Sequence, residues 1–281
     1  MRKIYKIFCV IFSLFLWFQS CCFASNTTHL TDTQIIKKIK KLDKKIKRNP
    51  NNSKLLIQRG FMKFCLKDYG SALEDYTLAE DTEPNNSDIF YSKGRVWFEK
   101  GKYNYALEEF DKAIKINPKD SKIYLSRGLT KEKLDDLDGA LIDYNLAIKY
   151  NRKSHAALIN RGIVYSRKGY YEKAISDYER ALKLCKYSPD AYYNLGLTKC
   201  SMGNYEEAIE DFNKSIEQNA NNGMAYYRRG QAYLKLDNQQ FAISDFKKAR
   251  QFCPNNDKIK EDYEKLKQEL DDLLKEEKIY Y

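Results

Sequence analysis

The stretch Asn160-Arg161-Gly162-Ile163-Val164-Tyr165 decides the fold, because its glycine belongs to a series that returns every 34 residues. The series has six members and no slip: Gly60, Gly94, Gly128, Gly162, Gly196 and Gly230. Twelve residues after each glycine stands an alanine: Ala72, Ala106, Ala140, Ala174, Ala208 and Ala242. Four residues further on stands an aromatic residue: Tyr76, Phe110, Tyr144, Tyr178, Phe212 and Phe246. Self-similarity at such a fixed period indicates a repeat architecture.

Small residues at two fixed places in each period predict pairs of closely packed helices. A glycine inside a helix costs about 1 kcal/mol relative to alanine, so six such glycines indicate that close packing requires them. One helix pair cannot bury its apolar face alone, so neighbouring pairs must stack. We therefore predict an all-α solenoid of six helical hairpins with one capping helix at each end. The units begin, at position 1, with Ser53, Ser87, Ser121, His155, Pro189 and Gly223.

Turn signals separate the units and divide each hairpin. Position 32 holds proline in three units and other residues in three: Pro84, Pro118 and Pro254, then Arg152, Lys186 and Ala220. Ser53, Ser87 and Ser121 follow such turns and are expected as helix N-caps. Position 15 holds glycine in three units, which predicts the turn inside the hairpin, and other residues in three: Gly101, Gly169 and Gly203, then Lys67, Asp135 and Asp237.

The pattern resembles the tetratricopeptide repeat family, which has a large residue at position 4, small residues at positions 8, 20 and 27, an aromatic residue at 24 and a proline at 32. The resemblance covers residues 53–256. It implies that the first helices of the units line a concave groove that binds an extended peptide or protein partner. Some members hold a C-terminal carboxylate with lysine, asparagine and arginine, but here Ile159 and Ile163 replace the lysine and the first asparagine. A complete carboxylate clamp is therefore not expected.

The resemblance also implies which side chains meet the partner. The candidates for peptide binding are Tyr91, Arg95, Asn160, Tyr193, Asn194, Tyr227 and Arg228. Asparagine can hydrogen-bond with an extended backbone, tyrosine offers rigid contact area, and arginine binds carboxylates. Most of these residues lie in the fourth to sixth units, which we therefore expect to contribute most to binding.

Charged residues also follow the period. Position 23 is acidic in every unit: Asp75, Glu109, Asp143, Asp177, Asp211 and Asp245. Position 7 is basic except at Leu195: Arg59, Lys93, Arg127, Arg161 and Arg229. A catalytic site does not recur six times, so these series predict ion pairs between helices. Sequence signatures of nucleotide, metal or nucleophile sites are missing, and we interpret the chain as non-enzymatic, without catalytic residues, metal or cofactor.

Residues 1–24 are predicted to form a secretory signal peptide. Arg2, Lys3 and Lys6 precede an apolar run over 7–18, and small residues at Cys22 and Ala24 favour cleavage after Ala24. We therefore expect an exported protein, periplasmic or secreted. Two alternatives stay open: a lipid anchor through Cys21 or Cys22, and an uncleaved membrane anchor.

Residues 25–52 are predicted to form a linker and a basic capping helix over 33–48. From Lys37 to Arg48 the chain carries eight basic residues against Asp43, a net charge of +7 within a total of +11. Residues 1–24 carry another +3, so the repeats are nearly neutral and binding of nucleic acid is not expected. The helix is either a solvated cap or a contact with an anionic membrane or acidic partner.

Residues 257–281 are predicted to form a C-terminal capping helix, because an apolar stripe runs along a polar sequence from Ile259 to Leu273. The stripe is too short to predict a coiled coil. The sequence as a whole favours an exported, non-enzymatic scaffold for protein–protein interaction, with 53–256 as the six repeats. The alternative is a lipid-anchored or membrane-associated envelope assembly factor. The sequence leaves the partner and the oligomeric state open.

Overall fold

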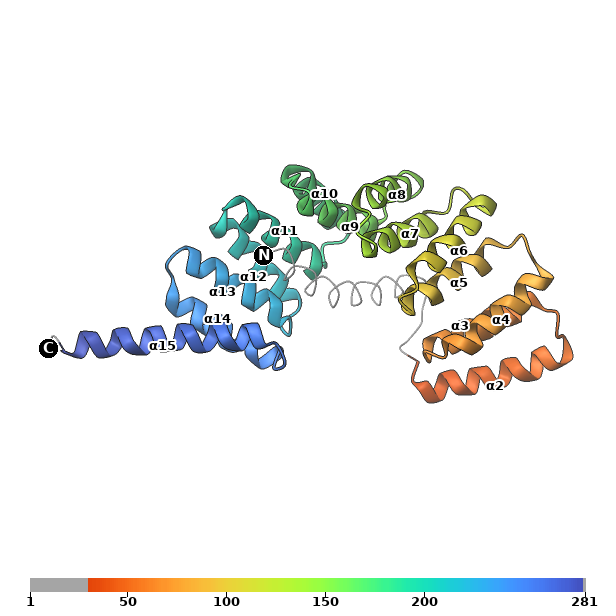
Figure 1. Cartoon of the computed structure of the whole chain (residues 1–281), viewed down its shortest axis with the longest axis horizontal. Helices are drawn as coiled ribbons and strands as arrows, with labels where there is room; N and C mark the ends of the chain where they lie inside the picture. Colours follow the sequence, from red (N-terminus) through yellow and green to blue (C-terminus); the bar gives the residue numbers. More distant parts are fainter. Residues whose placement is uncertain (1–29, 280–281) are drawn as a thin grey trace. The chain divides into compact units, whose positions relative to one another are not determined.

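The computed structural model describes the backbone of residues 30–279 and the side chains of residues 30–272. Every regular element in this part is an α-helix (Figure 1). The chain divides into two compact units, residues 1–157 and 158–281, which we call the N-terminal body and the C-terminal body. The predicted signal peptide, with Cys21 and Cys22, lies outside the described residues.

The helices occur in consecutive pairs, and their bounds follow the predicted units. The N-terminal body contains α2 (Asp32–Arg48), α3 (Ser53–Cys65), α4 (Tyr69–Thr82), α5 (Ser87–Glu99), α6 (Tyr103–Ile116), α7 (Ser121–Lys133) and α8 (Leu137–Tyr150). The boundary between the bodies falls within α9 (His155–Arg167). The C-terminal body continues with α10 (Tyr171–Leu184), α11 (Pro189–Met202), α12 (Tyr205–Gln218), α13 (Gly223–Lys235), α14 (Gln239–Phe252) and α15 (Asp257–Ile279). The predicted twelve repeat helices and two capping helices are confirmed, and the helices break also where proline is missing.

The glycine at position 8 lets the two helices of a hairpin touch. A Cβ atom built on any of the six glycines would lie 2.6–2.8 Å from a ring carbon of the aromatic residue at position 24. Real Cβ atoms essentially never come this close to another heavy atom. The close-contact role predicted from the period is therefore confirmed, and the rings behind the glycines are fully buried.

The turn inside each hairpin uses a left-handed residue at position 15. Gly101, Gly169 and Gly203 have φ values of 70°, 81° and 86°. Lys67, Asp135 and Asp237 adopt the same region, at 61°, 63° and 60°. An L-residue with a side chain is strained there by about 1–2 kcal/mol. The six turns therefore share one backbone path, and half of them are strained.

The prediction that Ser53, Ser87 and Ser121 are N-caps is wrong. Each serine is the first residue inside its helix, and the residue before it is the cap. The side chains of Asn52, Asn86 and Asp120 accept hydrogen bonds from backbone N–H groups of the first turn. Amide and carboxylate oxygens are good N-caps, and they leave the serine hydroxyl for other contacts, as at Ser121, which donates to the Ala147 carbonyl at 2.9 Å.

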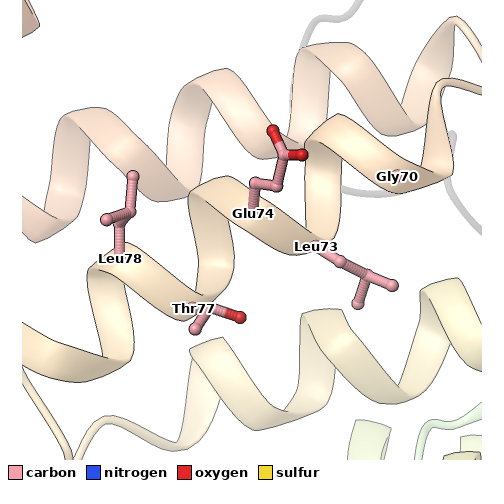
Figure 2. Close-up of a pocket in the computed structure, with 5 residues that line it drawn as sticks. All are labelled: Gly70, Leu73, Glu74, Thr77 and Leu78. Atoms are coloured by element: carbon pink, nitrogen blue, oxygen red, sulfur yellow. The ribbon is translucent and has the colours of Figure 1, made fainter.

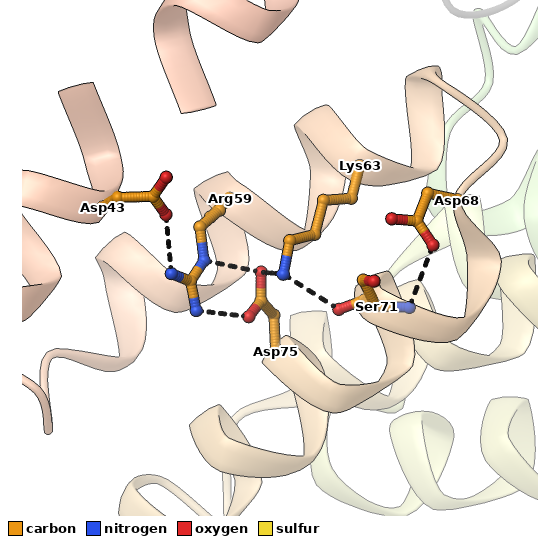
Figure 3. Close-up of polar contacts among 6 residues, drawn as sticks. All are labelled: Asp43, Arg59, Lys63, Asp68, Ser71 and Asp75. Carbon is orange, nitrogen blue, oxygen red and sulfur yellow. Dashed lines mark hydrogen bonds and ion pairs between the residues drawn. The ribbon is translucent and has the colours of Figure 1, made fainter. Parts of the chain in front are cut away.

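The predicted ion pairs between positions 7 and 23 are confirmed. Arg59 binds Asp75 through two nitrogens, at 2.6 and 2.9 Å, and its third nitrogen reaches Asp43 on the preceding helix at 2.8 Å (Figure 3). The same arrangement recurs at Arg127, and at Arg229 with Asn213 as the outer partner. We call this arrangement the arginine clasp. Because it binds its own hairpin and the preceding one, it fixes the stacking of consecutive units.

The clasp is altered in two hairpins. Lys93 in the second unit lies 2.7 Å from Glu80 and 3.6 Å from Glu109. Leu195 in the fifth unit makes no ion pair, and Asp211 is held by Lys199 at 2.8 Å. Burial raises the pKa of Asp211, although Lys199 opposes the shift. A single lysine therefore stabilises this carboxylate less well than the clasp does elsewhere.

Position 11 alternates along the array with a period of two hairpins. In odd units it is a lysine that pairs with the acid at position 23: Lys63 with Asp75 at 3.0 Å, Lys131 with Asp143 at 2.9 Å, and Lys199 with Asp211 at 2.8 Å. In even units it is an aromatic residue that contacts position 19: Trp97 with Tyr105, Tyr165 with Lys173, and Tyr233 with Phe241. Odd and even hairpins are therefore chemically distinct.

The two end helices cap the repeats with their apolar faces. Helix α2 buries Ile35 and Ile46, and its N-terminus carries a capping box between Thr31 and Gln34. Helix α15 buries Ile259 and Leu266 against the last hairpin. In the part of the chain that the structure describes, no helix is both long enough and apolar enough to span a membrane.

Candidate peptide-binding surface

The seven predicted binding residues all lie on first helices of the hairpins, as expected. Tyr91 and Arg95 belong to α5 in the N-terminal body. The other five belong to α9, α11 and α13 in the C-terminal body: Asn160, Tyr193, Asn194, Tyr227 and Arg228. The two bodies differ in how accessible these side chains are, so each is described separately.

In the N-terminal body, Arg95 lies in a cluster of aromatic rings. Its guanidinium carbon is 4.8 Å from the ring centroid of Phe64, 5.9 Å from that of Phe61 and 5.8 Å from that of Tyr91. Phe64 also contacts the ring of Tyr69 at the start of α4, at 5.8 Å. All of these side chains are partly exposed. A guanidinium stacked on rings is fixed in orientation and keeps its N–H edges in the ring-parallel plane, where carboxylates bind.

Glu99 adds an acidic group to this cluster. It is partly buried, and burial raises the pKa of its carboxyl while Arg95 and Lys67 oppose the shift. Sequence reasoning did not single out Glu99 or Tyr69. Glu99 occupies position 13, which the family resemblance places on the groove, so that signal was available. Tyr69 lies on a second helix, and a search restricted to first helices could not find it.

In the C-terminal body, most of the predicted residues are buried. Asn160, Tyr193 and Asn194 are 7%, 4% and 8% exposed. The ring of Tyr193 packs 5.9 Å from Phe212 in its own hairpin. The Asn194 amide donates to the Asp190 carbonyl within the same helix, at 2.8 Å. These groups therefore already serve the packing of the array, which reduces what they can offer to a partner.

Tyr227 is covered by the C-terminal capping helix. It is 3% exposed, its ring lies 5.4 Å from Phe246, and its hydroxyl donates to Asp262 of α15 at 2.6 Å. Arg228 beside it is partly exposed. Its guanidinium stacks 5.6 Å over Tyr227 and donates to Gln231, while its buried Nε has no hydrogen-bond partner among the described residues. Arg228 is therefore the accessible cation on this surface.

A buried carboxyl lies next to this row. Asp190 is in the first turn of α11, and burial raises the pKa of its carboxyl to about 6. Thr198, one helical turn beyond Asn194, hydrogen-bonds with Ser166 of α9 at 2.9 Å. First helices in the C-terminal body thus meet through polar groups, whereas those in the N-terminal body meet through aromatic ones.

The other surface features carry less chemistry. A shallow hollow of about 540 Å³ on α4 is lined by Gly70, Leu73, Glu74, Thr77 and Leu78 (Figure 2). It is mostly apolar and open to solvent, and Glu74 is its sole ionisable residue. Among the described residues, no group of His, Cys, Asp and Glu side chains is arranged to hold a metal ion.

Comparison with known families agrees with this geometry. The family described as "Tetratricopeptide repeat" matches residues 121–154, 189–222 and 223–256, and that described as "TPR repeat" matches 94–135 and 167–199. Together these matches cover more than half of the chain, which belongs to the tetratricopeptide repeat family. Such repeats generally mediate protein–protein interaction and typically form non-enzymatic scaffolds. Comparison with the curated proteins gives no match.

Solved structures share the fold. The APC/C hetero-tetramer Cut9-Hcn1 is 16% identical, with a TM-score of 0.71 over 84% of this chain, and this chain spans 46% of that one. PilW, a widely conserved type IV pilus biogenesis factor, is 19% identical, with a TM-score of 0.68 over 74% of this chain and 96% of its own. YrrB, a TPR protein with an unusual peptide-binding site, is 23% identical, with a TM-score of 0.54 over 66% of this chain and 95% of its own. At these identities the likeness concerns the fold alone.

Proposed function

We propose that this protein is an exported, non-enzymatic scaffold that binds an extended segment of a protein partner along its first helices. The observation that carries the proposal is the aromatic cluster around Arg95. The rings of Phe61, Phe64 and Tyr91 offer apolar contact area, and the stacked guanidinium offers an oriented charge beside it. The segment that fits this surface carries an acidic residue, or a free C-terminus, next to an apolar one.

The residues proposed to meet the partner are the seven predicted from the sequence, with different roles. Arg95, Tyr91 and Arg228 are partly exposed and make direct contacts. Asn160, Tyr193, Asn194 and Tyr227 are buried and support the surface from below. The two arginines are therefore the informative positions for a test, because substituting a buried residue also disturbs the packing.

Peptides selected from a random library on the immobilised chain, then synthesised, provide the ligand for the test. Arg95→Met and Arg228→Met keep the apolar stem and remove the charge, and we expect each to weaken the affinity of peptides that contact its site about 10- to 100-fold, measured by calorimetry. Arg250→Met is the matched control, because Arg250 also stacks on a tyrosine, Tyr263, but lies on a second helix. Circular dichroism checks folding. Equal affinity for all three variants and the parent would refute the proposed surface.

The export part of the proposal rests on the order of basic, apolar and small residues in 1–24. Mass spectrometry of the mature N-terminus tests it directly. A chain that begins at Ser25 is the expected result. A diacylglyceryl group on Cys21 or Cys22 would favour the alternative of a lipid-anchored envelope assembly factor, and an intact Met1 would contradict cleavage.

A further inference from the structure

Helix α2 carries two rows of side chains with the same spacing of four, three and four residues. The first row is apolar: Ile35, Ile39, Leu42 and Ile46. Ile35 and Ile46 are buried, and Leu42 and Ile46 join the core that contains Leu56 of α3. The repeats therefore already cover this row. It could enter a lipid bilayer only by leaving the end of the array exposed.

The second row is basic and faces away from the repeats. It consists of Lys37, Lys41, Lys44 and Arg48, each two residues beyond a member of the apolar row and therefore on the opposite side of the helix. We call it the basic row. All four side chains are exposed, and so are Lys38, Lys40, Lys45 and Lys47 beside them.

No acidic group neutralises this face. Within the described part of the chain, none of the eight basic side chains from Lys37 to Arg48 makes a hydrogen bond or an ion pair. Asp43, the one acid among them, is bound to Arg59 of α3 at 2.8 Å. The basic row thus presents a line of positive charge about 16 Å long on a rigid helix.

The composition of this face indicates which kind of anion it fits. Seven of its eight basic residues are lysines, and α2 contains no aromatic residue. Binding of single-stranded nucleic acid uses aromatic stacking, and bidentate recognition of individual phosphates or carboxylates uses arginine. Lysine is a strongly hydrated point charge that needs no fixed contact geometry. Such a face fits a surface with spread negative charge, and a bilayer that contains anionic phospholipid is such a surface.

The place of α2 in the chain points to the same occupant. The apolar run over 7–18 and the cysteines Cys21 and Cys22 precede it, and residues 19–31 can span at most about 45 Å. Whenever that run or a lipid on either cysteine enters a membrane, α2 is the first helix of the array at its surface. We propose that the basic row binds anionic phospholipid headgroups electrostatically, while the apolar row stays packed on the repeats. This proposal does not depend on the peptide-binding surface.

Vesicle co-sedimentation of the full chain tests it. The parent is expected to bind phosphatidylcholine vesicles that contain about one-third phosphatidylglycerol, and to lose this binding as salt rises from about 0.05 M to about 0.5 M. Replacing Lys37, Lys41, Lys44 and Arg48 by glutamine should weaken the binding about 100-fold. A matched control removes four exposed lysines that lie elsewhere and have no recorded partner: Lys102, Lys115, Lys119 and Lys247. It should change the binding less than about threefold.

Several results would overturn the proposal. Equal loss in the control variant would assign the effect to net charge. Tight binding to pure phosphatidylcholine, or binding that high salt leaves unchanged, would assign it to apolar insertion by another part of the chain. If poly-glutamate binds the parent as tightly as the vesicles do, an acidic protein segment is the better occupant. Arg95→Met and Arg228→Met should bind vesicles like the parent, so failure of the peptide surface leaves this test intact.

Discussion

Adding one methyl group at Gly162 should destabilise the fourth hairpin, because there is no room for it. The new Cβ would lie 2.6 Å from Cε1 of Tyr178 and 3.0 Å from Cδ1 and Cζ. The ring is 1% exposed and has no open space to move into, so the two helices must separate. Overpacking costs about 1–3 kcal/mol, and the better helix propensity of alanine offsets about 1 kcal/mol of this. We expect Gly162→Ala to lower the free energy of unfolding by about 1 kcal/mol, and the larger Gly162→Leu to lower it further.

Gly70 provides the matched control. It also lies in a helix, but a Cβ atom there meets nothing within 4 Å. Gly70→Ala should therefore stabilise the protein by up to about 1 kcal/mol, the opposite sign. Urea denaturation followed by circular dichroism measures both changes, and hydrogen exchange localises them, since repeat arrays need not unfold in two states. If both glycine-to-alanine variants shift stability in the same direction, the close-contact argument fails.

Two further predictions concern buried charges. Arg127→Met leaves the fully buried Asp143 with Lys131 as its remaining cation, so unfolding by urea should show a loss of about 2–4 kcal/mol, and a loss below about 0.5 kcal/mol would contradict the role of the clasp. Burial raises the pKa of Asp190 to about 6, so the folded state binds a proton more tightly than the unfolded state, and this group's contribution to stability is greatest below about pH 4 and falls as pH rises to about 6. Asp190→Asn should flatten that pH dependence and raise stability at pH 7; an Asp190 carboxyl that titrates near pH 4 by NMR would contradict it.

The fold was predictable from the sequence because its determinants are local and repeated. A glycine at position 8 and an aromatic residue at position 24 must touch in every hairpin, so one contact is written six times in the sequence. The N-caps were harder to predict. Asn52 and Ser53 are both good capping residues, and the choice between them depends on where the first hydrogen-bonded turn begins.

The candidate surface was less predictable, because exposure depends on neighbours that the repeat pattern does not specify. Position 5 places a tyrosine on the first helix, but whether its hydroxyl is free depends on the next element of the chain. At Tyr227 that element is the irregular cap α15, whose Asp262 accepts its hydrogen bond. Arg95 could be placed on the groove from its position, but the rings around it come from α3 and from α5 itself, so the cluster emerges from the packing.

The alternation at position 11 makes a 68-residue segment, and not the single hairpin, the smallest module that repeats with its chemistry intact. Inserting or deleting 34 residues would place two lysine-bearing hairpins, or two aromatic-bearing hairpins, next to each other. Inserting or deleting 68 residues would preserve the order. The pattern is what growth by duplication of a two-hairpin segment would leave behind, as three tandem copies. An array lengthened by protein engineering should therefore be built from a 68-residue cassette that begins with an odd unit, such as residues 121–188.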